Sequence, residues 1–87
     1  MGIEVYNGYF YVTNFTNNTI VKINANNASD FQNPWFSASL VLNAPRGIVY
    51  YGDYFYVASS VGSTITQINA NNPAIYTASW ANNTTQG

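Results

Sequence analysis

Few side chains in this sequence could take part in catalysis or metal binding. The 87 residues include no cysteine, no histidine and three carboxylates, Glu4, Asp30 and Asp53. General acid–base catalysis requires a titratable group close to the reacting atom, and a structural metal site requires several converging ligands. The three carboxylates are scattered along the chain, and Asp53 stands in a segment typical of a tight turn. We therefore expect no catalytic residue, no metal site, no cofactor and no enzymatic activity.

Aromatic and amide side chains offer a different chemistry, the binding of sugars or peptides. Aromatic residues make up 17% of the chain, which also contains fourteen asparagines. Binding pockets commonly combine aromatic rings with a few polar groups. Trp35, Trp80 and the asparagine-rich segments 14–18, 24–27 and 69–72 are therefore candidates for a glycan site. The alternative is that both tryptophans belong to the core and that the asparagines close turns.

The charge balance argues against two further classes of partner. Charged residues make up 6% of the chain and the net charge is −1, whereas an ordinary soluble domain carries roughly 25% charged residues. Lys22 and Arg46 are isolated, so there is no basic surface for nucleic acid or for an anionic membrane. We also expect neither a signal peptide nor a transmembrane helix, because no apolar run reaches the length of about 18 residues that a span requires. The cellular location stays unknown.

An internal repeat determines which elements position these residues. The segment YFYV at 9–12 recurs at 54–57, and INANN at 23–27 recurs at 68–72, so both recurrences lie 45 residues apart. Across the matched stretch 14 of 26 positions are identical. A period of 20 to 50 residues indicates structural units that stack on one another.

After INANN the first copy carries five additional residues, and the match resumes at an offset of 40. This offset places Trp80 opposite Leu40, and it places Gly87 opposite Gly47 and Gly2. We expect Gly2 and Gly87 to lie where one chain leads into the next. The expected units are residues 1–46 and 47–87.

Each unit reads as four short strands, because runs of β-branched and aromatic residues alternate with Asn, Gly, Pro and Ser. Two residues separate the first two strands of each unit, Asn7-Gly8 and Gly52-Asp53, and both pairs suit a tight hairpin turn. The expected strands are 2–6, 9–14, 19–24 and 35–41 in the first unit, and 47–51, 54–59, 64–69 and 75–80 in the second.

The second strand of each unit is apolar on both faces, although a strand with one solvated face should alternate. Both faces of each sheet must therefore be covered, and stacked copies of the same unit would cover them. The residues expected to form this packing are Tyr9, Phe10, Tyr11, Val12, Tyr54, Phe55, Tyr56 and Val57.

These repeats resemble the blades of NHL-type and YVTN-type β-propellers. The resemblance covers about 26 residues of each copy and rests on a Pro-x-Gly-Ile opening at 45–48, a tight turn, a Tyr-Val strand that includes Tyr11-Val12-Thr13-Asn14, and a Thr-Ile-x-x-Ile strand. Gly2 lacks the preceding proline, and Thr85 replaces it before Gly87. The resemblance implies an all-β propeller of four to eight blades, each with four antiparallel strands.

Two blades cannot close such a ring, so the resemblance implies that several copies assemble. Closed head-to-tail contacts give cyclic symmetry. A homo-trimer with six blades is the first expectation and a homo-tetramer with eight is the second. Glu4 would then recur once per chain near the axis, where it could bind a cation or accept hydrogen bonds.

Two functions follow as expectations. The first is a structural module, natural or engineered, that self-assembles into a propeller without catalysis. The second is a lectin or peptide-binding module with repeated weak glycan sites, for which Trp35, Trp80 and Glu4 are the candidate residues.

Overall fold

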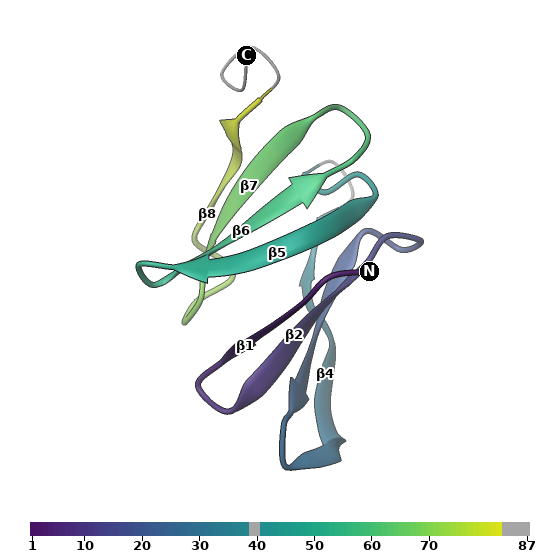
Figure 1. The fold of residues 1–87 in the computed structure, drawn as a ribbon, viewed down its shortest axis with the longest axis vertical. Coiled ribbons are helices and arrows are strands. Elements are labelled where there is room, and N and C mark those ends of the chain that lie inside the picture. Colours follow the sequence, from purple (N-terminus) through teal and green to yellow (C-terminus); the bar gives the residue numbers. More distant parts are fainter. Residues whose placement is uncertain (39–40, 83–87) are drawn as a thin grey trace.

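The computed structural model describes residues 1–38 and 41–82 and is built of β-strands alone over those ranges (Figure 1). No helix that could cross a membrane occurs within them. The strands are β1 (Ile3–Tyr6), β2 (Tyr9–Asn14), β3 (Thr19–Asn24), β4 (Asn27–Ser37), β5 (Pro45–Tyr51), β6 (Tyr54–Ser59), β7 (Thr64–Asn69) and β8 (Tyr76–Ala81).

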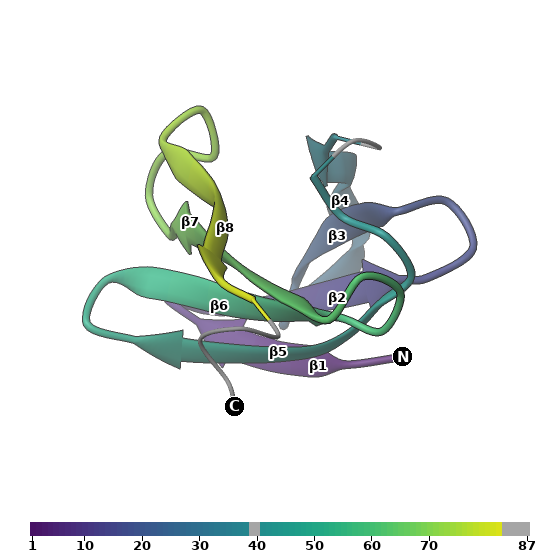
Figure 2. The same ribbon diagram turned by 90° about the horizontal axis from the view of Figure 1, so that it is seen from above.

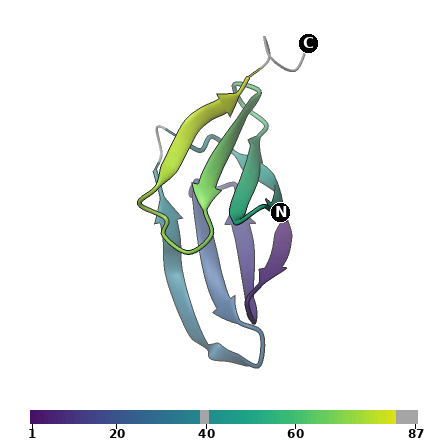
Figure 3. The ribbon, with the colours of Figure 1, turned by 90° about the vertical axis from the view of Figure 1, so that its left-hand side faces the viewer.

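The strands form two four-stranded antiparallel sheets with the same topology. The first sheet has the order β1-β2-β3-β4 and the second the order β5-β6-β7-β8, so sequential strands are always neighbours (Figure 3). The hairpins that open the sheets turn at Asn7-Gly8, with φ of 52° and 82°, and at Gly52-Asp53, with φ of 57° and 73°. Positive φ at both central residues is the geometry of the expected tight turn. The all-β class and both opening hairpins are confirmed.

The fourth strand of the first sheet is longer than the sequence predicted. We expected it to begin near residue 35, but β4 begins at Asn27, directly after a two-residue turn at 25–26. Its first eight residues are exposed, because an edge strand needs no apolar face to pair with its neighbour. In the second sheet Pro73 has no amide hydrogen for the ladder, and β8 begins only at Tyr76.

The pairing of the fourth strands also differs from the expected offset of 40. Phe31 on β4 and Tyr76 on β8 each pair with the second isoleucine of the preceding strand, and both strands then bulge before their last residues. The two strands therefore correspond at an offset of 45, like the rest of the repeat. Trp80 is consequently the counterpart of Trp35 and not of Leu40.

The two sheets pack face to face at an angle. The first strands of the two sheets, β1 and β5, lie beside each other, and the sheets diverge toward β4 and β8 (Figure 2). Between them lies one apolar core. Its buried side chains are Tyr11, Ile20, Phe36, Leu42, Phe55, Val57, Ile68 and Ala70.

Candidate functional site

The strands β2 and β6 direct their side chains alternately to the two faces of their sheets. Tyr11 and Thr13 are buried against the second sheet, and Phe55 and Val57 are buried against the first. We call this packed region the shared contact. Within residues 1–38 and 41–82 no strand covers the opposite faces. We call them the first open face, which carries Phe10, and the second open face, on which β6 presents its tyrosines.

An aromatic cluster holds the shared contact together. The Phe55 ring is fully buried, and its centroid lies 4.4 Å from that of Tyr11, 5.7 Å from that of Trp35 and 6.0 Å from that of Tyr6. Tyr6 stacks on Tyr50 of the second sheet with centroids 4.4 Å apart. Edge-to-face and offset aromatic pairs contribute about 0.5–1.5 kcal/mol each beyond their buried area. Trp35, a candidate ligand residue by sequence, is therefore engaged in packing.

Glu4 of β1 links the first sheet to β5 of the second sheet by a hydrogen bond. In each opening hairpin the amide of the second residue before the turn points away from the paired strand. These residues are Val5 in β1 and Tyr50 in β5. Glu4 accepts hydrogen bonds from both amides, Oε1 from Val5 and Oε2 from Tyr50, each at 2.9 Å. This arrangement supports the hydrogen-bonded reading of Glu4 over the cation site, because both carboxylate oxygens already accept amide hydrogens.

Gly2 lies at a close approach between the sheets. Its amide donates to the Thr13 hydroxyl at 2.7 Å, and that hydroxyl lies 3.1 Å from the Arg46 carbonyl oxygen, to which it can donate. A Cβ atom on Gly2 would collide with the same carbonyl oxygen. Gly2 therefore lies at a junction between sheets within one chain. Gly87, its expected partner at the chain-to-chain junction, lies outside the described residues.

Several counterparts 45 residues apart differ in burial according to whether they lie in the shared contact or on an open face. Phe55 is fully buried in the shared contact, whereas Phe10 on the first open face is half-buried. Tyr11 is 2% exposed, whereas Tyr56 on the second open face is half-buried. Several apolar side chains on the open faces are half or more exposed: Ile3 62%, Val5 54%, Val49 52%, Tyr51 75% and Trp80 50%.

The second open face contains an apolar pocket of about 250 Å³. The Trp80 ring packs edge-on against Tyr56 with centroids 4.8 Å apart, as Trp35 packs against Tyr11 at 4.9 Å in the shared contact. Trp80, the other tryptophan predicted to bind ligands, thus lies on a surface whose residues correspond to those that the first sheet contributes to the shared contact. The pocket is lined by Tyr51, Tyr56, Ile65 and Trp80.

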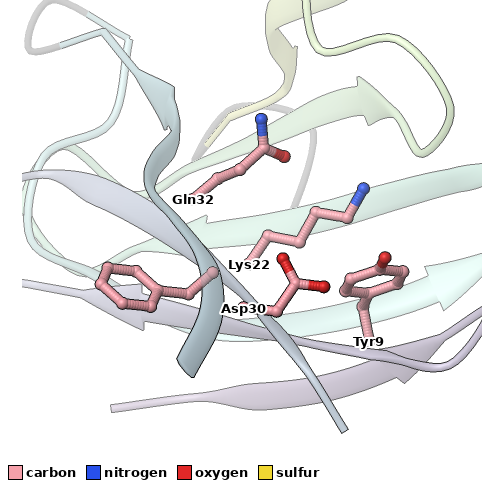
Figure 4. Close-up of a pocket in the computed structure, with 5 residues that line it drawn as sticks. Tyr9, Lys22, Asp30 and Gln32 are labelled. Carbon is pink, nitrogen blue, oxygen red and sulfur yellow. The ribbon is translucent and has the colours of Figure 1, made fainter. Parts of the chain in front are cut away.

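A second, more polar pocket of about 180 Å³ is lined by side chains from β2, β3 and β4 of the first sheet (Figure 4). Lys22 places its Nζ atom 4.4 Å from the centroid of the Tyr9 ring, a cation–π contact. Asp30 accepts a hydrogen bond from the Asn24 amide at 3.0 Å. The pocket thus offers an aromatic face beside groups of both charges, a combination that can bind hydroxyl groups. It is lined by Tyr9, Lys22, Asp30, Phe31 and Gln32.

The hydroxyls of Tyr11 and Tyr50 are weaker acids than an ordinary tyrosine. Burial, with smaller contributions from Tyr6 and Tyr9, raises the pKa of Tyr11 from 10.0 to about 12. Desolvation and the hydrogen bond to Asp53 also raise the pKa of Tyr50. Both phenols therefore stay protonated at neutral pH.

The asparagine-rich turns are occupied by local hydrogen bonds. Asn24 Oδ1 accepts from the Asn26 amide at 2.8 Å, and Asn69 Oδ1 accepts from the Asn71 amide at 2.9 Å. These are Asx turns, which close hairpins. Asp53 lies in a turn as predicted and accepts the Tyr50 hydroxyl at 3.1 Å.

The sequence did not single out either pocket as a site. The polar pocket combines residues of three strands, β2, β3 and β4, and the expected boundary of the fourth strand left out most of its lining. The apolar pocket could have been found by adding 45 to the positions that line the shared contact.

Comparisons with protein-family models, with curated proteins and with solved structures gave no match.

Proposed function

We propose that this chain supplies two blades of a β-propeller of the NHL or YVTN type and that several identical chains close the ring. Its role is structural, and assembly is its activity. One observation carries the proposal: residue types that pack where the two sheets meet recur, more exposed, on the two open faces. An exposed apolar surface of this kind marks an interaction site.

Ring closure also accounts for the direction of the contact. The two open faces differ from each other, so identical chains join head to tail, and such contacts close into rings when the rotation permits. Three chains give six blades, the number we favour, and four chains give eight.

Native mass spectrometry tests the ring. We expect a single species with three times the 9.6 kDa mass of the chain, or four times that mass for the eight-bladed form. Sedimentation at several concentrations would show whether the species is closed, because an open assembly grows with concentration whereas a ring has one size. A folded species of 9.6 kDa at micromolar concentration contradicts the proposal.

The polar pocket favours a second candidate function, the binding of a glycan. Its counterparts in the second sheet replace the two charged residues Lys22 and Asp30 by Gln67 and Ile75, so this site would occur once per chain rather than once per blade. Titration with a panel of neutral and acidic oligosaccharides, followed by NMR, tests it. We expect shifts around Lys22 that Lys22→Ala abolishes and Gln67→Ala leaves unchanged. No shift with any member of the panel contradicts this function.

A further inference from the structure

We propose that Phe10 of one chain inserts into the apolar pocket on the second open face of the next chain. This contact rests on the proposed self-assembly, since its partner is a second copy, but it does not depend on ring size. It assigns a side chain and a receiving pocket to the interface.

The shared contact supplies the template. Phe55 of the second sheet lies among the rings of Tyr6, Tyr11 and Trp35 of the first sheet. Subtracting 45 from Phe55 gives Phe10, which projects from the first open face. The four pocket residues Tyr51, Tyr56, Ile65 and Trp80 are the counterparts, 45 residues later, of Tyr6, Tyr11, Ile20 and Trp35.

All five positions of this contact carry the same residue type in both copies. A pocket built from the same side chains, with its Tyr56 and Trp80 rings 4.8 Å apart as against 4.9 Å in the template, resembles the site that receives Phe55. Close packing of this kind is sensitive to single methylene groups. Identity at these five positions therefore favours a second copy over an unrelated partner.

Neighbouring positions extend the match. Ile48 and Val57 flank Phe55 on β5 and β6, and their counterparts Ile3 and Val12 flank Phe10. Ile3 is 62% exposed in the single chain. The apolar surface around Phe10 thus resembles the surface that the first sheet already receives within the chain, with Val5 in place of Tyr50.

A polar contact is repeated as well. Tyr6 donates its hydroxyl hydrogen to Asn71 Oδ1 across the shared contact at 3.0 Å. The counterparts are Tyr51, which is 75% exposed, and Asn26 in the turn between β3 and β4. In the proposed contact the Tyr51 hydroxyl donates to Asn26 of the neighbouring chain.

Two variants, each with one damaged face, test this assignment. Phe10→Lys removes the inserted ring and leaves the pocket intact, whereas Trp80→Lys damages the pocket and leaves Phe10 intact. Both positions lie on open faces, where a lysine head can reach water. Removing a central aromatic residue weakens an interface by about 30-fold or more. Each variant alone should therefore run as a monomer at a concentration where the wild type is assembled.

Mixing the two variants should restore one contact. The pocket of Phe10→Lys is intact and so is the ring of Trp80→Lys, so the pair should form a 1:1 dimer that grows no further. Thr16→Lys introduces the same charge in the exposed turn between β2 and β3 and should assemble like the wild type. Circular dichroism should show the same strand content in every variant. If the lysine variants do not fold, Phe10→Ala and Trp80→Ala give the same reading.

The outcomes separate this inference from the ring itself. An assembled wild type whose mass is unchanged by Phe10→Lys overturns the contact and leaves the ring standing. Folded monomeric variants that form no dimer on mixing overturn the head-to-tail insertion. A monomeric wild type overturns both proposals.

Discussion

Replacing Phe55 by alanine should remove a large share of the stability of the single chain. The ring is fully buried and contacts Tyr6, Tyr11, Trp35 and Tyr50 within centroid distances of 4.4–6.0 Å. Truncation of a buried phenylalanine to alanine costs about 3–5 kcal/mol. A domain of 87 residues has a free energy of unfolding of about 4–13 kcal/mol. The variant should therefore be marginally folded or unfolded.

Urea titration followed by circular dichroism at several protein concentrations measures this effect, with Phe10→Ala as the matched control. Phe55→Ala should lower the free energy of unfolding by about 3–5 kcal/mol at every concentration. Phe10 is half-buried in the single chain, so its truncation should cost about 1 kcal/mol in dilute solution. The deficit of Phe10→Ala relative to wild type should grow with concentration, because assembly stabilises the folded state by mass action.

Two results would refute this reasoning. If Phe55→Ala costs less than about 1 kcal/mol, the aromatic cluster is not the principal packing between the sheets. If the two variants lose equal stability at all concentrations, then the two phenylalanines do not occupy the different environments on which the proposed assembly depends.

Three further predictions follow from the same contacts. Gly2→Ala should destabilise the chain by about 1–3 kcal/mol in thermal unfolding because its Cβ meets the Arg46 carbonyl oxygen, whereas Gly47→Ala, whose nearest neighbour would be 3.9 Å away, should leave the dilute chain unchanged. Equal effects would contradict this placement of Gly2. The pKa of Tyr11 is raised from 10.0 to about 12 in the folded state, so its contribution to the free energy of unfolding should be full below about pH 10 and lost as the pH rises through about 12. Tyr11→Phe should flatten that part of the plot of unfolding free energy against pH, and an unchanged plot would exclude this cause. Thr19→Val should raise the free energy of unfolding by about 1 kcal/mol, because Thr19 Oγ1 is buried without a hydrogen-bond partner among the described residues. A lower free energy of unfolding in the variant would mean that the hydroxyl is hydrogen-bonded.

Local signals in the sequence predicted most of the strands. Asn7-Gly8 and Gly52-Asp53 tolerate positive φ and therefore specify the hairpins through short-range sterics alone. The apolar segments around Tyr11 and Phe55 then give β2 and β6, whose observed bounds match those predicted.

Local sequence signals did not predict the start of β4, the edge strand of the first sheet. Residues such as Asn27 and Asp30 are typical of turns, yet they lie in β4 because the backbone of β3 offers a ladder to pair with. Side-chain type carries little information where both faces of a strand are exposed. The polar pocket depends on this strand, so it was missed for the same reason, and the counterpart of Trp80 was misassigned because the expected alignment relied on those residues.

The differences between the two copies bear on the order in which the proposed assembly comes apart. The shared contact includes two polar connections, from Glu4 to the Tyr50 amide and between the Thr13 hydroxyl and the Arg46 carbonyl. The counterparts of Glu4 and Thr13 on the second open face are Val49 and Ala58, which cannot make either connection. The contact between chains therefore depends on apolar packing and on the Tyr51 hydroxyl, and it is the weaker of the two kinds of junction. On dilution the chains should separate from one another before the two sheets of any one chain do, because hydrogen bonds to a charged carboxylate add about 1.5–3 kcal/mol where they are present.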